Sequence, residues 1–340
     1  MRPFHYVESA GAQEATQSVS SGAEAVFFAG GTTLIDLMKI DVLRPDTLVS
    51  VNQLPLGEIE VDANGVHIGA NVRNSQLAWH GTIREQYPVL SEALLAGAST
   101  QLRNMATTAG NIMQRTRCPY FRDVTTACNK RSPGSGCGAL HGYNRSHAVL
   151  GTSENCIATN PSDMCVALVM LDASVRTLRP DGSTRTIPFN DFHRLPGDTP
   201  HIETVLEHGE LITHLNLSNL PMARRSLYLK VRDRASYEFA LASAAVALEL
   251  DGNTIRAARV GLGGIAAKPW RSQGAEEALI GKKADEKTFK AAAEAALEGA
   301  VGREHNAFKI ELAKRTLVHA LEQLTTRMAQ GENGTWQQQR

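Results

Sequence analysis

The hydrophobic and polar positions in the first third of the chain alternate between strand-like and helix-like patterns. Residues 25–29 form a short apolar run that is typical of a buried strand and ends at a pair of glycines. Residues 32–40 repeat apolar side chains at helical spacing, and residues 47–51 are again strand-like. The chain is therefore expected to open as a β-α-β arrangement.

The same kinds of pattern predict most of the remaining elements. Residues 62–65 form a turn between two short alternating runs, which predicts a hairpin, and residues 74–98 are expected to be helical. The polar residues 331–340 are expected to be disordered. The other predicted features are a helix at 164–172, a hairpin near 181–182, a crossing into a second unit at 219–225, strands at 240–250 and 254–261, and helices at about 283–300 and 306–328.

The bulk composition argues against several classes of protein. Hydrophobic residues make up 42% of the chain and charged residues 21%, which is ordinary for a globular protein. Lys and Arg number 35, as do Asp and Glu, so we expect no general affinity for nucleic acid. No apolar run approaches the roughly 18 residues of a membrane span, so no membrane insertion is expected. The N-terminus lacks a signal-peptide pattern, which predicts a cytoplasmic protein or one exported with a partner that carries the signal.

The five cysteines all lie within one stretch of 48 residues. Residues 113–157, called the cysteine segment below, lack clear periodicity, so something other than a hydrophobic core is expected to order them. The clustering of cysteines predicts a metal or cluster site. The spacing matches neither a bacterial ferredoxin nor a zinc finger, so it does not choose between the two. Cys165 lies in an apolar helix and is interpreted as a buried structural residue. The candidate ligands are Cys118, Cys128, Cys137 and Cys156.

A glycine pair, Gly30 and Gly31, stands between the first predicted strand and the first predicted helix. Glycines at such a junction let backbone N–H groups approach an anion, and the threonine hydroxyls that follow add donors. This chemistry suits a pyrophosphate. A tight turn that simply needs glycine explains the same residues equally well.

Three further motifs each have an ordinary structural interpretation. Small residues that end at Gly110 and Asn111 are by themselves a turn signal. Asp163 begins a helix, which it or Ser162 could cap, and its carboxylate could instead bind a cofactor hydroxyl. Lys230 lies in a strand among alternating charges, a pattern that is usually a solvated face.

In this order along nearly the whole chain, the four motifs resemble the FAD-binding subunits of the xanthine dehydrogenase and molybdenum hydroxylase family. The resemblance implies an α+β fold. Residues 1–222 would form a two-part FAD-binding domain of the vanillyl-alcohol oxidase type, with residues 113–157 inserted, and residues 223–330 a small C-terminal α+β domain like that of CO dehydrogenase flavoproteins. The chain departs from the family pattern at Ala109, where a glycine is usual.

The resemblance also implies which residues bind FAD. The loop at 27–34 would wrap the pyrophosphate, and residues 107–111 would form a second loop at the phosphates and the flavin. Asp163 would bind a cofactor hydroxyl, Lys230 would lie beside the flavin or its phosphates, and Ile212 would pack on the flavin. The implied FAD-binding residues are Phe27, Phe28, Ala29, Gly30, Gly31, Thr32, Thr33, Leu34, Thr107, Thr108, Gly110, Asn111, Asp163, Ile212 and Lys230.

The cysteine segment is similar to that of the family subset found in bacterial periplasmic aldehyde oxidoreductases, which carries a [4Fe–4S] cluster. Cys118, Cys128, Cys137 and Cys156 would then be its ligands, and nearby basic residues would offset its negative charge. The resemblance implies electron transfer from a molybdenum cofactor on a large partner subunit, through [2Fe–2S] clusters on a small partner, to FAD on this chain and then to an external acceptor.

Two other functions are compatible with the residues. One is a stand-alone flavin oxidase or dehydrogenase that binds its own substrate. The other is a non-enzymatic assembly scaffold that is stapled by zinc, in which the glycine loops are merely turns.

Overall fold

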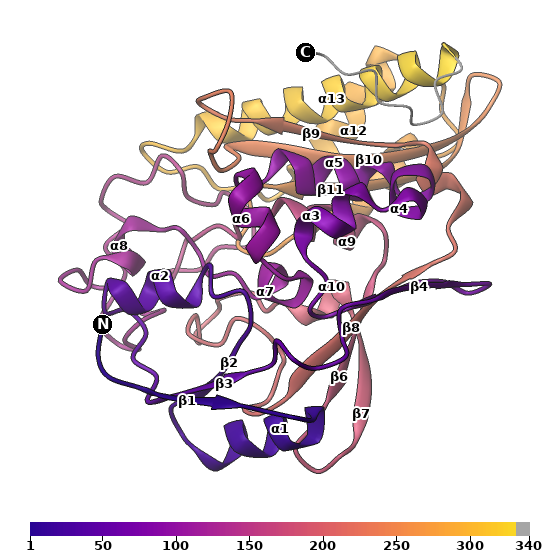
Figure 1. Ribbon diagram of the computed structural model, residues 1–340. Helices are drawn as coiled ribbons and strands as arrows, with labels where there is room; N and C mark the ends of the chain where they lie inside the picture. Colours follow the sequence, from indigo (N-terminus) through magenta and orange to yellow (C-terminus); the bar gives the residue numbers. More distant parts are fainter. Residues whose placement is uncertain (331–340) are drawn as a thin grey trace.

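The computed structural model of the chain describes residues 1–330, and the residues for which we expect disorder, 331–340, lie outside the described part. Helices and strands are mixed along the chain, as expected for an α+β protein (Figure 1). Within residues 1–330, no helix is both long and apolar enough to cross a membrane.

The first elements are β1 (His5–Glu8), α1 (Ala12–Ser21), β2 (Ala25–Phe28), α2 (Leu34–Lys39) and β3 (Thr47–Ser50). The strands form a parallel sheet in the order β1-β3-β2, which confirms the predicted β-α-β arrangement. Strand β1 and helix α1 were not predicted. All residues of β1 are exposed, so this strand has no apolar alternation that could reveal it.

The second sheet consists of β4 (Ile59–Asp62), β5 (Gly65–Gly69), β6 (Ser174–Leu178), β7 (Thr184–Pro188) and β8 (Leu211–Ser218). It is antiparallel, in the order β4-β5-β8-β6-β7. Both predicted hairpins are present, and β8 joins them by pairing with β5 on one side and β6 on the other. Residues far apart in the sequence are thereby brought into one sheet.

The residues expected to be helical at 74–98 form three short helices, α3 (Asn74–Trp79), α4 (Gly81–Gln86) and α5 (Pro88–Ala96). The chain leaves helical geometry at His80 and again at Tyr87, the residue that precedes Pro88. A proline disfavours helical geometry in the residue before it, which explains the second break. The helices that follow are α6 (Thr100–Met105), α7 (Thr108–Ile112), α8 (Pro119–Arg122), α9 (Asp163–Met170) and α10 (Phe189–Phe192).

Helix α9 confirms the helix predicted after the cysteine segment and settles which residue caps it. The Ser162 hydroxyl accepts a hydrogen bond from the backbone N–H of Cys165 at 3.1 Å, so Ser162 is the cap. The side chain of Asp163 is therefore available for other contacts. Cys165 is fully buried, as predicted, and burial raises the pKa of its thiol to about 12.

The C-terminal half begins with η1 (Pro221–Arg224) and continues with β9 (Ser226–Val231), β10 (Ala242–Asp251), β11 (Thr254–Gly263), β12 (Trp270–Arg271), α11 (Gln273–Leu279), α12 (Glu286–Ala296) and α13 (Phe308–Ala329). Its strands form an antiparallel sheet in the order β12-β11-β10-β9. The predicted strands and the last two helices are present, whereas α11 was not predicted.

The C-terminal sheet is buried on both faces. Helices α11 and α13 contact one face, and α5 and α9 of the N-terminal half lie against the other (Figure 1). Successive residues of β10 point to opposite sides, so Val246 belongs to the core under α13 and Ala245 to the core shared with α9. The two halves therefore share a continuous hydrophobic core.

Candidate functional site

Two cavities, of about 430 Å³ and about 480 Å³, lie on either side of the loop that joins β2 to α2. Thr32, Thr33 and Gly110 line both of them, so the two cavities form one elongated cleft. The first cavity is bordered by residues 204–212, and the second by residues of α9, β9 and the loop at 237–239. Of the fifteen residues that the sequence assigned to FAD, all but Phe28 and Thr108 line this cleft.

Residues 29–33, called the glycine loop below, run between the two cavities. A Cβ atom on Gly30 would lie 2.1 Å from the carbonyl oxygen of Met105, and Gly31 has a φ of +68°. Both positions therefore require glycine. Among the hydrogen bonds of residues 1–330, none uses the backbone N–H of residues 30–33 as donor. The tight turn and the anion-binding loop are thus not alternatives, because the turn leaves unpaired N–H groups beside the cleft.

The second loop, at residues 107–111, is held mainly by its own polar groups. The Thr107 hydroxyl accepts from the N–H of Gly110 at 3.1 Å, and the Thr108 hydroxyl donates to the carbonyl of Val72 at 2.9 Å. The Asn111 side-chain oxygen accepts from the hydroxyl of Ser162 at 2.7 Å. These contacts explain why Thr108, although close to the cleft, does not line it.

Asp163 and Lys230, which are 67 residues apart in sequence, form a buried ion pair in the second cavity. The Lys230 ammonium donates to Asp163 Oδ2 at 2.8 Å, and its side chain is only 4% exposed. The interpretation of Lys230 as part of a solvated face is therefore wrong. Strand β9 packs against α5, which hides this face from solvent, and the ammonium also donates to the carbonyl of Ala96 at 3.1 Å.

Tyr228 is a member of this site that the sequence analysis missed. Its hydroxyl donates to Asp163 Oδ1 at 2.5 Å, and burial raises its pKa well above the ordinary value, which keeps the hydroxyl protonated. Tyr228 and Lys230 are two positions apart on β9, and residues at this spacing share one face of a strand. That spacing was the signal that could have revealed Tyr228.

The loop at 237–239 was also missed. Its residues line the second cavity, and the guanidinium carbon of Arg117 lies 5.3 Å from the centre of the Phe239 ring. Tyr237 and Phe239 are exposed, although both are aromatic. An aromatic pair shortly after Lys230, in an otherwise polar stretch, was the available signal for an element at the mouth of the cleft.

The four candidate cysteines of the cysteine segment are close to one another. Burial raises the pKa of Cys118 to about 12, and the thiols of Cys128 and Cys156 add to this rise. Burial also raises the pKa of Cys156, and the thiols of Cys137 and Cys128 contribute. The backbones of Cys128 and Cys137 pair in an isolated antiparallel β-bridge. All cysteines are free thiols, and within residues 1–330 no three or more His, Cys, Asp or Glu side chains are arranged to hold a single metal ion.

Ion pairs connect the cysteine segment to its surroundings. Asp36 of α2 accepts from Arg117 at 2.9 Å and from Arg122 at 2.7 Å, and the Arg122 guanidinium above all holds the pKa of Asp36 below its usual value. Glu203 pairs with Lys130 at 2.7 Å and also with Arg115. Arg115, Arg117 and Lys130 were expected only to offset charge on a cluster, and the structure shows that they also pair with carboxylates outside the segment.

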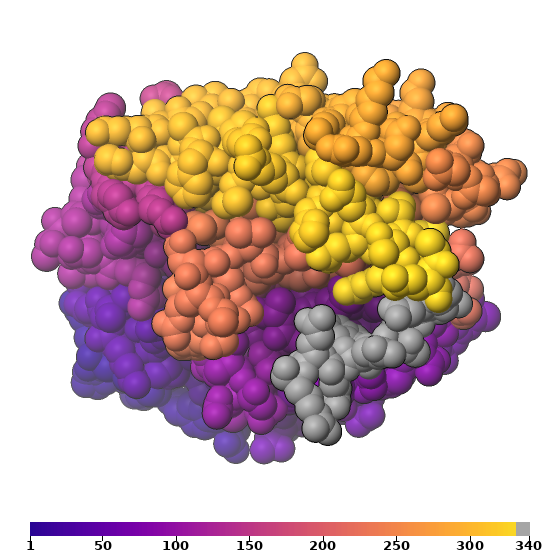
Figure 2. All heavy atoms as spheres, turned by 90° about the horizontal axis from the view of Figure 1, so that it is seen from above, coloured from indigo at the N-terminus to yellow at the C-terminus, as the bar shows by residue number. Residues whose placement is uncertain are grey.

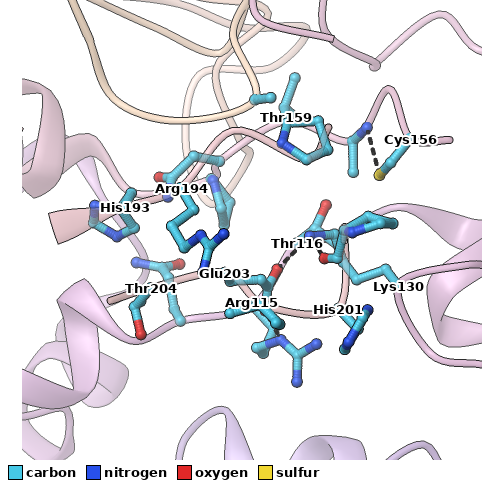
Figure 3. A pocket seen from close by; sticks show the side chains of 18 of the residues that line it. Arg115, Thr116, Lys130, Cys156, Thr159, His193, Arg194, His201, Glu203 and Thr204 are labelled. Atoms are coloured by element: carbon cyan, nitrogen blue, oxygen red, sulfur yellow. Dashed lines mark hydrogen bonds and ion pairs between the residues drawn. The ribbon is translucent and has the colours of Figure 1, made fainter. Parts of the chain in front are cut away.

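A smaller cavity, of about 220 Å³, is lined by residues of the cysteine segment and by residues between 193 and 204 (Figure 3). Cys156 lies at its edge, and Arg115, Lys130 and Glu203 face it. His193 also lines it, with Nε2 at 3.0 Å from the carbonyl of Ile112. Because Arg115 lines the long cleft as well, the cysteine segment and the long cleft are neighbours.

Comparison with protein families matches residues 2–219 to the FAD binding domain in molybdopterin dehydrogenase and residues 227–324 to the CO dehydrogenase flavoprotein C-terminal domain. The chain therefore belongs to the family of FAD-binding subunits of the molybdenum hydroxylases, and it is a subunit of an oxidoreductase. The resemblance stated from the motifs is thereby confirmed.

Individual relatives agree with this assignment. The chain is 52% identical over 323 residues to the aldehyde oxidoreductase FAD-binding subunit PaoB of Escherichia coli (strain K12), a match that covers 94% of this chain and 98% of that one. It is 28% identical over 288 residues to the glyceraldehyde dehydrogenase medium chain of Sulfolobus acidocaldarius, with 84% of each chain covered. A chain of the carbon monoxide dehydrogenase of Hydrogenophaga pseudoflava has the same fold, with a TM-score of 0.75 at 24% identity and 96% of this chain covered.

Proposed function

We propose that this chain binds FAD along the long cleft, with the pyrophosphate at the glycine loop. The unpaired N–H groups of residues 30–33 and the Thr32 and Thr33 hydroxyls are the donors that a pyrophosphate needs, and they lie where the two cavities meet. A bound flavin supplies the conversion between one-electron and two-electron transfer. The protein contributes binding, orientation and the exclusion of water.

Each cavity would hold a different part of the cofactor. Asp163 and Lys230 form a buried ion pair at the second cavity. Asp163 would accept a hydrogen bond from a cofactor hydroxyl there, and Lys230 would lie beside the flavin or its phosphates. Ile212, which lines the first cavity, would pack on the flavin.

We also propose that Cys118, Cys128, Cys137 and Cys156 hold a [4Fe–4S] cluster. Such a cluster is held by four thiolates, which agrees with four neighbouring cysteines that are all free thiols. Backbone N–H groups face the sulfurs: Ala158 donates to Cys156 Sγ at 3.5 Å, and Tyr120 and Phe121 lie at Cys118. Such donors stabilise thiolates that bind iron.

The proposed complex is a heteromeric aldehyde oxidoreductase. Its molybdenum cofactor would belong to a large partner and its [2Fe–2S] clusters to a small one, and FAD on this chain would pass electrons to an external acceptor. The aldehyde assignment rests on the 52% identity to the E. coli subunit. In domain terms, residues 1–222 would carry FAD, with the cluster in 113–157, and 223–330 would form the C-terminal domain. Export with a partner that carries a signal would make the complex periplasmic, and without such a partner it would be cytoplasmic.

Cofactor analysis of anaerobically purified chain tests both proposals. We expect one FAD and four iron atoms per chain, with loss of iron and retention of FAD in Cys118→Ser. Cys165→Ala, which changes a cysteine outside the segment, should keep both. Folded protein without flavin would overturn the FAD site, and flavin without iron would overturn the cluster. Turnover of an aldehyde by the isolated chain would instead establish a stand-alone flavin enzyme.

A further inference from the structure

His147 lies inside the cysteine segment, is almost fully buried, and is used by none of the roles above. Its Nε2 atom is 3.1 Å from Cys118 Sγ. Its ring lies 6.1 Å from the ring of Tyr120, in a tilted arrangement. A buried imidazole at this distance from a proposed cluster ligand can change the electronic character of that sulfur.

We infer that His147 is a positioning residue that donates a hydrogen bond to the Cys118 thiolate and thereby raises the reduction potential of the cluster. This inference rests on the cluster of the proposed function. A thiolate has only lone pairs to offer, so contact with Nε2 requires the proton on Nε2 in either charge state of the ring. His147 Nδ1 has no hydrogen-bond partner within residues 1–330.

The backbone at His147 is held from the C-terminal half. The Lys309 ammonium of α13 donates to the carbonyls of Ser146 at 3.1 Å and His147 at 3.0 Å, and the Asn306 amide donates to the carbonyl of Ala148 at 3.1 Å. Lys309 and Asn306 are completely buried. Figure 2 shows golden atoms of the C-terminal part of the chain beside the magenta cysteine segment at one edge of the molecule.

This arrangement fixes the imidazole from two directions. Lys309 and Asn306 hold the main chain, and Tyr120 borders the ring. Buried carbonyls of an irregular segment need hydrogen-bond donors, and these two buried side chains supply them, so the main chain at His147 is held in place. The contacts therefore define where the imidazole lies, and it lies at Cys118.

The expected direction of the effect follows from charge. Reduction adds negative charge to the cluster and its thiolates, and a hydrogen bond to sulfur stabilises the more negative state. Loss of the donor should therefore lower the potential. A tenfold change in a one-electron reduction equilibrium corresponds to about 59 mV, and we expect a shift of roughly this size for one hydrogen bond.

The test is a redox titration of the complete complex, followed by the EPR signal of the reduced cluster, in His147→Ala and His147→Gln. We expect His147→Ala to keep its iron and to have a reduction potential about 59 mV more negative, which is a tenfold change in the reduction equilibrium. His147→Gln, which retains a donor, should recover part of this shift. His141→Ala is the matched control, because His141 is an exposed histidine of the same segment. An unchanged potential in an iron-replete His147→Ala complex would refute the inference.

A second measurement needs no variant and remains decisive if His147→Ala loses its cluster. Unaltered protein with ¹⁵N-labelled histidine should show a nitrogen coupling to the reduced cluster in pulsed EPR. A cluster without this coupling would overturn the role of His147. Absence of iron and sulfide from the unaltered protein would instead overturn the proposed cluster itself, so the two failures are distinguishable.

Discussion

The glycine loop and the cysteine segment are neighbours, yet different interactions hold them in place. The glycine loop joins a partly buried strand to a helix, and its shape depends on backbone packing, with Gly30 against the carbonyl of Met105. The cysteine segment contains little regular structure and depends on side chains from elsewhere, such as Asp36, Glu203 and Lys309. The glycine loop therefore depends mainly on backbone packing, whereas the cysteine segment depends on side chains from distant parts of the chain.

This comparison predicts separable defects, and the largest is expected at Gly30. In Gly30→Ala the added Cβ would lie 2.1 Å from the Met105 carbonyl oxygen, so the loop must shift and its N–H groups move away from the pyrophosphate. We expect FAD affinity to fall at least about 100-fold, equivalent to about 2.7 kcal/mol, with iron content unchanged. Flavin titration of deflavinated protein measures this effect.

Gly57→Ala is the control for that variant, because a Cβ at Gly57 would meet no atom within 4 Å. It should bind FAD as the unaltered chain does. Equal affinity in Gly30→Ala and Gly57→Ala would show that the glycine loop is not where the cofactor binds.

A smaller effect is expected at Tyr228. Tyr228→Phe removes the hydroxyl that donates to Asp163 at 2.5 Å and leaves Lys230 as the main partner of that carboxylate. A hydrogen bond to a charged group contributes about 1.5–3 kcal/mol, so we expect FAD to bind about tenfold more weakly. Tyr143→Phe, which changes an exposed tyrosine, is the control. Unchanged FAD affinity in Tyr228→Phe would exclude Asp163 from the cofactor site.

The smallest effect tests the cysteine segment. Glu203→Gln removes the negative charge that pairs with Lys130 and Arg115, and partly buried pairs of this kind contribute about 1 kcal/mol. We expect residues 113–157 to be cleaved about fivefold faster in limited proteolysis, with FAD affinity changed less than twofold. Glu154→Gln, at a glutamate of the same segment whose side chain is 87% exposed, should cleave normally. A large loss of FAD in Glu203→Gln would contradict the separation of the two regions.

The same contrast explains what the sequence could reveal. The strand, glycine loop and helix at 25–39 follow one another directly, so apolar spacing and a glycine pair are enough to predict them. The break at Tyr87 also had a local signal in Pro88, which the helical expectation for 74–98 passed over. Local physics was sufficient wherever the elements that determine a shape are adjacent in the sequence.

Contacts across long sequence separations left no such signal. Asp36 and Arg117 are 81 residues apart, and Lys309 and Ser146 are 163 residues apart. Charge and spacing in one stretch cannot identify the partner in the other. Lys230 shows the same limit. The charge pattern of its strand predicted a solvent-exposed lysine, and only the packing of α5 against β9 reveals that the lysine is buried.

The origin of Tyr228 and Lys230 has a thermodynamic consequence for the whole chain. Both belong to the C-terminal sheet, whereas Asp163 and the glycine loop belong to the N-terminal half. A ligand that needs both halves binds only the state in which they are docked, and each tenfold rise in its free concentration above Kd stabilises that state by about 1.4 kcal/mol. FAD would thus act as a clamp, and cells short of flavin would accumulate chains whose two halves separate more readily.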